Sequence, residues 1–290
     1  MKKIASLLLG VSLLAACAPS DRRIAPSGDL VANASVALEN GRIAERFEAA
    51  EYILIGEKHD NPEHHDIQLA LLQALVKPGD VVVFEMLNRE QQPVIDRFLS
   101  GALPDSELEK ALDWKASGWP DWQHYGPLFE AAKDGGARIY YGSFPKKELR
   151  RKMILADDHF APLSAVLHDD LDLQIKSSHC DLLPENMIRP MSNIQIAKDK
   201  KLAQELVENR QGGRAFLIAG NGHIRKDRAV PFYLKQLDKE ATVQVLALIE
   251  ERDTDALEDP FPLYDTLWLT SSTPEKDYCA DLRKKFGKAS

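Results

Sequence analysis

The chain has 290 residues, of which 44% are hydrophobic and 28% are charged. This ordinary globular composition excludes a coiled coil, a collagen and a largely disordered chain. The formal net charge of -8 gives the protein no general attraction for nucleic acid, so we expect no nucleic-acid partner.

The N-terminus has the pattern of a signal peptide. Lys2 and Lys3 form a short basic start, and the apolar run over residues 4–14 is too short to span a bilayer as a mature helix. Small residues then precede Cys17, and this arrangement resembles a bacterial lipobox. The resemblance implies cleavage after residues 1–16 and a lipidated Cys17. The alternative is a plain secretory signal in which Cys17 lies near the cleavage site by chance.

The residues after Cys17 indicate where the protein is held. Ala18 at the second mature position resembles the default for outer-membrane lipoproteins, and residues 17–40 are polar enough to form a tether. No later segment has the roughly 18 apolar residues that a membrane-spanning helix needs. We therefore expect a protein of the bacterial cell envelope that is anchored to the outer membrane through lipid on Cys17.

Short apolar segments alternate with helical patterns through the rest of the chain. The predicted strands are residues 52–56, 81–84, 138–141, 214–219, 243–249 and 266–269. Between the first two, Asn61-Pro62 predicts an N-cap followed by proline at the first helical position. Strands that alternate with helices predict an α/β fold with a largely parallel sheet flanked by helices.

The same pattern sets the expected domain limits. One α/β domain is predicted over residues 41–272, followed by a charged C-terminal tail over 273–290. Helical insertions over about 89–135 and 145–210 are too long for simple crossovers, so they predict a helical cap over one edge of the sheet. The second insertion is expected to break near its prolines, which are Pro162, Pro184 and Pro190.

Besides Cys17, the chain has two cysteines, Cys180 and Cys279. An oxidising compartment permits a disulfide between them, and this is the interpretation we favour. Two buried thiols or a metal ligand are the alternatives.

Polar residues follow four of the predicted strands. Ligands of open α/β sheets bind outside the carboxyl ends of the strands. Glu57 and His59 follow the first strand, Glu85 follows the second, Ser143 follows the third, and His223 follows the fourth. The pattern G-x-x-H occurs twice, at 56–59 and at 220–223. A parallel sheet would bring these side chains to one rim, whereas the alternative is that each merely caps a strand or helix.

The histidines and carboxylates expected at this rim suit either metal binding or general-base catalysis. Imidazole and carboxylate ligands suit a divalent metal, with His59, Glu57 and His223 as the candidates. Glu57 can instead act as a general base beside a metal-bound water. His64 and His65 lie in the first turn of the following helix, and one of them is expected to face the rim.

Aromatic residues gather in one segment, although they form only 7% of the chain. Its members are Trp114, Trp119, Trp122, Tyr125 and Phe129. They can pack a cap onto the sheet, or they can form a flat wall for a planar ligand with the Tyr125 phenolate available. A tyrosine can ligate haem iron, with a histidine supporting it.

Several motifs in this order resemble the ChaN family of haem-binding lipoproteins. They are ILIGEKHDNPEHHDIQ, the FEM after the next strand, WPDWQHY, HCDLLPENM and AGNGHIRKDRAVPFYL, which together run from about Tyr52 to Cys279. The family is related to the Tiki and TraB proteins and more distantly to erythromycin esterases.

The resemblance implies an iron-regulated lipoprotein that binds haem and supports haem-iron uptake. It also implies a homodimer with haem at the subunit interface, a tyrosine on the iron, a histidine nearby and an outer-membrane haem receptor as a further partner. Tyr125 is the best match for the tyrosine, with Tyr140, Tyr141 and Tyr233 as rivals. The full set that we assign to haem is Tyr125, His59, His64, Glu85 and His223.

The two G-x-x-H motifs leave an enzyme as the alternative. In Tiki proteins such motifs are associated with metal-dependent proteolysis, which implies a hydrolase or peptidase using Glu57, His59 and His223. A structural envelope lipoprotein with an unused cleft is a third interpretation.

Overall fold

The computed structural model describes residues 23–24, 47–154, 158–256, 263–274 and 276–286. The predicted signal peptide, Cys17 and most of the predicted tether lie outside these residues. Within them, no helix is long and apolar enough to cross a bilayer.

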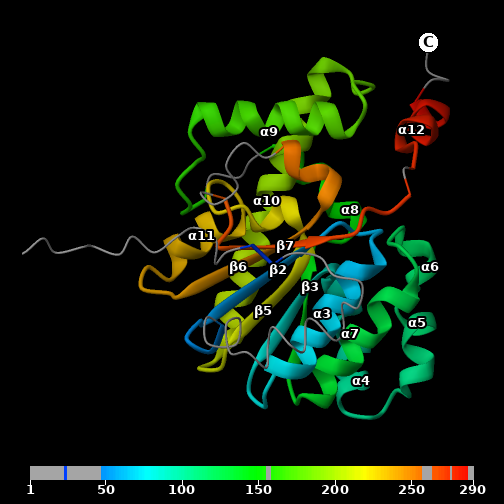
Figure 1. Cartoon of the computed structure of the whole chain (residues 1–290), viewed down its shortest axis with the longest axis vertical. Helices are drawn as coiled ribbons and strands as arrows, with labels where there is room; N and C mark the ends of the chain where they lie inside the picture. Colours follow the sequence, from blue (N-terminus) through cyan, green and yellow to red (C-terminus); the bar gives the residue numbers. More distant parts are fainter. Residues whose placement is uncertain (1–22, 25–46, 155–157, 257–262, 275, 287–290) are drawn as a thin grey trace, which may run out of the picture.

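A parallel β-sheet forms the centre of the molecule (Figure 1). Every strand pair in it is parallel, and the strand order is β1-β7-β6-β2-β5-β3-β4. The strands are β1 (Arg23–Ile24), β2 (Tyr52–Glu57), β3 (Val81–Asn88), β4 (Arg138–Ser143), β5 (Ala215–Gly220), β6 (Val243–Glu250) and β7 (Thr266–Thr270). The predicted α/β fold is therefore confirmed.

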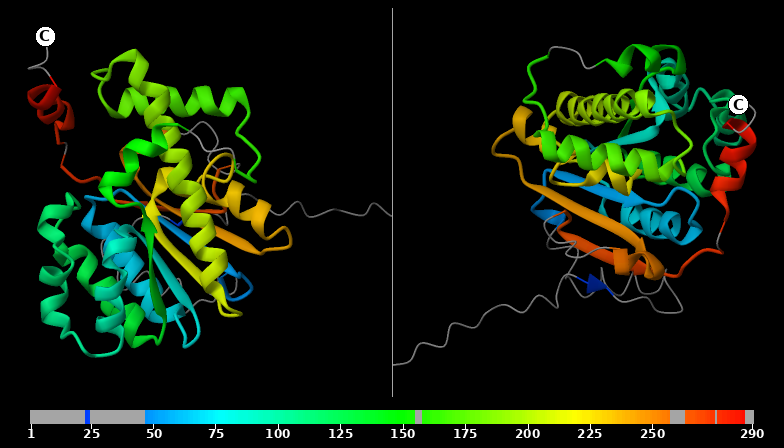
Figure 2. Two further views of the ribbon diagram at one scale, coloured as in Figure 1. Left: turned by 180° about the vertical axis from the view of Figure 1, so that it is seen from behind. Right: turned by 90° about the horizontal axis from the view of Figure 1, so that it is seen from above.

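Helices cover both faces of the sheet (Figure 2). One face is covered by α3 (Pro62–Leu75), α4 (Gln92–Leu99), α5 (Leu108–Ala111), α6 (Trp114–Ser117) and α7 (Trp122–Asp134). The other face is covered by α10 (Glu185–Arg210) and α11 (Val230–Leu237), with α9 (Ala165–Ser178) packed on α10. Alternate residues of β2 belong to the two cores: Ile53 and Ile55 face the first layer, whereas Tyr52 and Leu54 face the second. Burial on both faces explains why the strands are continuously apolar.

The start of α3 follows from local sequence. The Asn61 side chain accepts a hydrogen bond from the backbone N–H of Glu63 at 2.9 Å, and Pro62 occupies the first turn, where its missing N–H costs nothing. The predicted N-cap is confirmed, and it fixes the turn that carries the loop 58–61 from β2 into the helix.

The prediction for the second insertion was partly wrong. A helix does begin after Pro184, but α10 continues through Pro190 as one helix of 26 residues. Proline in the second turn removes only one backbone hydrogen bond, to the carbonyl of residue 186. Burial of Ile196, Leu202 and Leu206 against the sheet keeps the helix continuous.

The C-terminal segment returns to the body of the protein. A disulfide joins Cys180, just after α9, to Cys279 in the short helix α12 (Tyr278–Phe286). Part of the predicted tail is therefore a helix that is covalently tied to the second helical layer.

Candidate functional site

The two G-x-x-H motifs lie side by side at the carboxyl ends of β2 and β5. These strands are neighbours in the sheet, and their register pairs Gly56 with Ala219 and Glu57 with Gly220. The first motif continues into the loop before α3, and the second into a short 3-10 helix, η5 (Asn221–Ile224). The repeated pattern thus reflects two adjacent strand ends that face one rim.

The first glycine of each motif leaves room for side chains of the other motif or of the residue that follows it. A Cβ on Gly56 would overlap the side chains of Asn221 and Ile224. A Cβ on Gly220 would lie 3.0 Å from Nε2 of His59. Close approach of side chain to backbone, rather than an unusual φ angle, therefore requires both glycines.

Glu57 is buried at the centre of the first motif. Its Oε1 accepts hydrogen bonds from the Tyr125 hydroxyl at 2.5 Å and from His59 Nδ1 at 2.7 Å, and its Oε2 accepts one from Gln68 at 2.8 Å. Burial acts to raise the pKa of Glu57, but the hydrogen bond from His59 and the nearby His65 outweigh it, so the pKa lies below its ordinary value. Glu57 is therefore an anion that orients the His59 ring.

His59 is the accessible imidazole of the rim. Its side chain is 36% exposed, its Nε2 lies 4.0 Å from Oε2 of Glu85, and its ring meets that of Trp119 edge-on at 4.9 Å. Burial acts to lower the pKa of His59, but the hydrogen bond to Glu57 and the charge of Glu85 raise it above its ordinary value. The ring is fixed at one nitrogen and open to a ligand or proton at the other.

Glu85 connects the two motifs. Its Oε1 accepts a hydrogen bond from Lys198 Nζ at 2.5 Å and lies 3.1 Å from Nε2 of His223, while its Oε2 accepts the backbone N–H of Gly220 at 3.0 Å. Burial acts to raise the pKa of Glu85, but the positive charges of His223 and Lys198 hold it well below its usual range. Glu85 is thus an anion whose two oxygens are both engaged.

His223 lies behind Glu85 and is almost fully buried. Its Nδ1 is 2.5 Å from Oδ1 of Asp199. Burial acts to lower the pKa of His223 and Lys198 also lowers it, but the charges of Glu85 and Asp199 raise it to about 9. Burial raises the pKa of Asp199 to about 6. Protonated His223 between two carboxylates is therefore a structural cation, and its burial withholds it from direct contact with a ligand.

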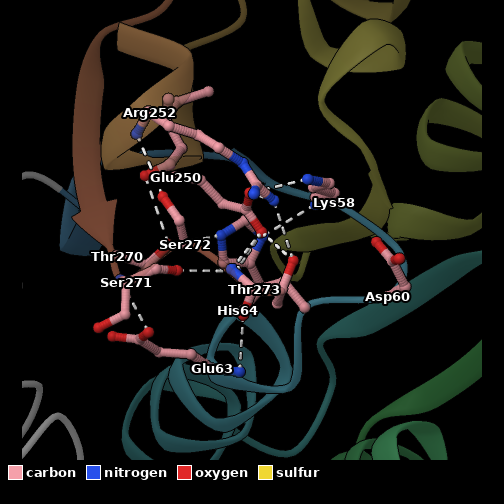
Figure 3. Close-up of polar contacts among 12 residues, drawn as sticks. Lys58, Asp60, Glu63, His64, Glu250, Arg252, Thr270, Ser271, Ser272 and Thr273 are labelled. Atoms are coloured by element: carbon pink, nitrogen blue, oxygen red, sulfur yellow. Dashed lines mark hydrogen bonds and ion pairs between the residues drawn. The ribbon is translucent and has the colours of Figure 1, made fainter. Parts of the chain in front are cut away.

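His64 does not reach the rim, contrary to the assignment of this residue to haem. Its Nδ1 accepts the backbone N–H of Lys58 at 2.8 Å, and its Nε2 lies 2.8 Å from Thr270 Oγ1. Burial lowers the pKa of His64 to about 3, so the ring is neutral. Figure 3 shows this residue in a separate polar cluster that joins the start of α3 to the ends of β6 and β7. His65 supports the rim indirectly, because its Nε2 lies 3.0 Å from the carbonyl oxygen of His59.

Tyr125 also lies elsewhere than expected. It has no exposed surface, its hydroxyl donates to Glu57, and burial together with Glu57 raises the pKa of Tyr125 far above its ordinary value. A neutral phenol enclosed in this way is not available to haem iron in this structure. Among its rivals, Tyr233 is fully buried, and Tyr140 and Tyr141 lie half-buried on β4.

Packing explains most of the aromatic segment. Trp114 and Phe129 are buried in the first core beside Tyr125, and Trp122 packs against that core. Trp119 of this segment lines the cleft described next. Of the aromatic wall that was expected for a ligand, this segment contributes Trp119 to the cleft, and its other aromatic residues pack in the core.

A cleft of about 660 Å³ opens beside the rim. Glu85 and Lys198 lie in its lining, and the lining also includes Trp119 from the α6–α7 loop and Phe144 from just after β4. The rest of the wall is mixed: it has apolar side chains such as Met86, Leu112, Leu149 and Ile194, the cations Lys146 and Lys147, the acids Glu90 and Asp113, and neutral polar residues. Its volume is in the range of ordinary small-molecule sites, and Trp119 and Phe144 give its wall two aromatic surfaces.

The described residues do not form the expected metal site. They contain no group of three or more His, Cys, Asp or Glu side chains arranged to hold a metal ion. Glu57 and His59 bind each other, and the ammonium of Lys198 lies between Glu85 and His223, 3.3 Å from Nε2 of the latter. The side chains that were expected to bind a metal therefore interact with one another or with Lys198.

Lys198 and Asp199 were missed by the sequence analysis. Both lie in α10, within a run of charged residues that looks like a solvated helix face. Asp199 is buried and the Lys198 side chain is 16% exposed. Only the packing of α10 over the ends of β3 and β5 reveals their contacts with Glu85 and His223.

The fold and rim define a class of protein: a parallel α/β sheet with helices on both faces and a histidine–carboxylate network at the carboxyl ends of its strands. Residues 43–234 match the family model for haem-binding uptake proteins of the Tiki superfamily, ChaN. The chain therefore belongs to the ChaN family. No curated protein matches the sequence significantly.

A solved structure of this family shows the same fold. ChaN of Campylobacter jejuni, described with cofacial haem binding, is 22% identical and has a TM-score of 0.61, covering 71% of this chain and 85% of that chain. Two more distant structures are also similar. The erythromycin esterase EreC, as a mutant in its open conformation, is 14% identical with a TM-score of 0.45, covering 74% of this chain and 73% of that chain. The type III effector HopBA1 is 14% identical with a TM-score of 0.43, covering 88% and 99%.

Proposed function

We propose that this protein binds haem in the cleft beside His59 and Glu85. The observation that carries the proposal is the position of the cleft in a member of the ChaN family: two residues of its lining, Glu85 and Trp119, lie next to His59. Trp119 and Phe144 supply aromatic surface in its wall. This lining fits a porphyrin, which needs apolar contact on its faces.

Charge and accessibility assign roles to particular side chains. Lys146 lines the cleft and provides a cation for a propionate group, whereas Lys147 in the same lining is paired with Glu90. Among the residues assigned to haem from sequence, His59 is the one whose side chain is substantially exposed, and Glu57 fixes its orientation. Haem supplies an iron that accepts a nitrogen or oxygen ligand, and His59 is the side chain in reach of the cleft that can serve or support that role.

We further propose that the mature protein is a lipid-anchored envelope protein that supports haem-iron acquisition. The support is the basic start, short apolar run and Cys17 at the N-terminus, together with the family. A homodimer and an outer-membrane haem receptor as partner complete this proposal.

Hemin titration of the chain from Ala18 onward tests the binding proposal, because this chain keeps every described residue. We expect a saturable change in the Soret region at fixed stoichiometry. Binding that never saturates would contradict it. Growth on haem as sole iron source tests the physiological part: a deletion strain should grow poorly, and complementation with the gene encoding wild-type protein should restore growth.

A second candidate function is acid–base catalysis of hydrolysis in the same cleft. It is favoured by the Glu57–His59 pair at 2.7 Å, in which a carboxylate orients a partly exposed imidazole. Hydrolysis of a p-nitrophenyl ester by the purified chain, abolished by His59→Ala, would support this candidate. Equal rates for wild type and variant would remove it.

A further inference from the structure

A basic segment stands out on this acidic protein. Residues 146–152 contain five cations and one acid, whereas the whole chain has a net charge of -8. The segment forms helix α8 (Lys146–Leu149) and the 3-10 helix η4 (Arg150–Met153), just after β4. We call its cations the basic strip: Lys146, Lys147, Arg150, Arg151 and Lys152.

Local contacts use only part of this charge. Lys147 pairs with Glu90 at 2.5 Å, and the one acid of the segment, Glu148, pairs with Arg89 outside it at 2.8 Å. Arg150 and Arg151 are exposed, and neither makes an ion pair or side-chain hydrogen bond with another described residue. The strip therefore presents uncompensated positive charge to its surroundings.

An exposed apolar side chain adjoins these charges. Ile154 is 81% exposed, directly after η4. The backbone beneath it is held in place, because the Asn193 side chain donates to the Met153 carbonyl at 2.8 Å and η4 packs on α10. An exposed isoleucine on a supported backbone, next to several cations, is an arrangement that membrane-surface proteins use.

We propose that the basic strip and Ile154 dock on an anionic phospholipid surface. Anionic headgroups complement the unpaired arginines, and the acyl boundary accepts the isoleucine. A nucleic acid would use the charges but leave Ile154 in water. The net negative charge elsewhere on the protein orients it, since an anionic surface attracts this face and repels the remainder.

Docking in this way places the cleft beside the membrane. Lys146, Lys147 and Leu149 belong both to the segment and to the lining of the cleft. The cleft would therefore open toward the bilayer interface, from which an apolar ligand can enter without crossing bulk water. The docking itself does not depend on the identity of that ligand.

Vesicle co-sedimentation with the chain from Ala18 onward tests the proposal, because it removes any contribution of a lipid anchor. The probes are vesicles of phosphatidylcholine with phosphatidylglycerol and vesicles of phosphatidylcholine alone. We expect binding to the anionic vesicles only, weakened by added salt. Arg150→Gln with Arg151→Gln should lower the partition coefficient by roughly tenfold or more, and Ile154→Ser should lower it further.

The pair Lys235→Gln and Lys239→Gln is the matched control, because both lysines are exposed and the change in net charge is the same. Equal loss of vesicle binding in the control would overturn the proposal, as would equal binding to both kinds of vesicle. Arg150, Arg151 and Ile154 do not line the cleft. Hemin binding should therefore be unchanged in their variants, and this separates failure of docking from failure of haem binding.

Discussion

The ring of His59 lies against the backbone of Gly220, so closely that a Cβ on Gly220 would stand 3.0 Å from Nε2 of His59. The two residues belong to different G-x-x-H motifs, 161 positions apart, on neighbouring strands. The histidine of one motif is thus positioned by the glycine of the other, and the repeated pattern forms one site.

Gly220→Ala should displace His59 while leaving the fold intact, because the imidazole can move and the backbone need not. We expect hemin affinity to fall by about tenfold, which corresponds to roughly 1.4 kcal/mol. Titration of hemin into both proteins measures it. Gly222→Ala is the control, since a Cβ there meets nothing within 4 Å. Equal affinities of the two variants would contradict the role given to Gly220.

Tyr125→Phe should affect stability rather than haem binding. The hydroxyl donates to the buried, ionised Glu57, and loss of such a bond costs about 1.5–3 kcal/mol of unfolding free energy. Urea unfolding should show this loss, whereas Tyr140→Phe should show little, because no hydrogen bond joins the Tyr140 hydroxyl to a described residue. A hemin spectrum altered in Tyr125→Phe but unaltered in Tyr140→Phe would restore Tyr125 as a haem ligand.

Breaking the disulfide should destabilise the protein. It links residues 99 positions apart, and chain-entropy models assign such a loop up to about 4.7 kcal/mol, with about 2–4 kcal/mol usual. Cys180→Ser with Cys279→Ser should therefore lower the urea midpoint, and reductant should lower that of the wild type but not that of the variant. Identical midpoints for all samples would show that the two cysteines are not bonded.

The buried His223 predicts a pH dependence of stability. Its pKa is raised to about 9 because the attraction of Glu85 and Asp199 outweighs burial and Lys198. A folded-state pKa above the unfolded value means that its stabilisation is complete below about pH 6.5 and is lost as pH rises through 9. The unfolding free energy of the wild type should fall over this window relative to that of His223→Gln. Parallel curves would show that His223 is not protonated when folded.

Local patterns in the sequence were sufficient to predict the sheet and the rim. Runs such as Tyr52–Gly56 are apolar on both faces because helices bury both sides of the sheet. Glu57 and Glu85 come at strand ends, and parallel strands bring such ends together. The rule that parallel strands end at the same edge of a sheet was therefore enough to predict that these side chains lie close together.

The finer roles depended on packing that no spacing reveals. Tyr125 and Trp119 lie six positions apart, yet one is enclosed against Glu57 and the other lines the cleft. His64 and His65 are adjacent, but His64 turns toward Thr270 and His65 toward the carbonyl of His59. The packing of the surrounding helices decides which side chains face the rim. Residue spacing alone does not predict this orientation.

The hemin spectrum of His59→Ala, compared with that of Tyr125→Phe, is the decisive test of haem binding beside His59. The imidazole of His59 is partly exposed next to Trp119 of the cleft lining, whereas the phenol of Tyr125 is buried against Glu57. We therefore expect His59→Ala to weaken saturable hemin binding or alter the Soret band, and Tyr125→Phe to retain the wild-type spectrum. Unchanged binding and spectrum in His59→Ala would contradict the proposed site.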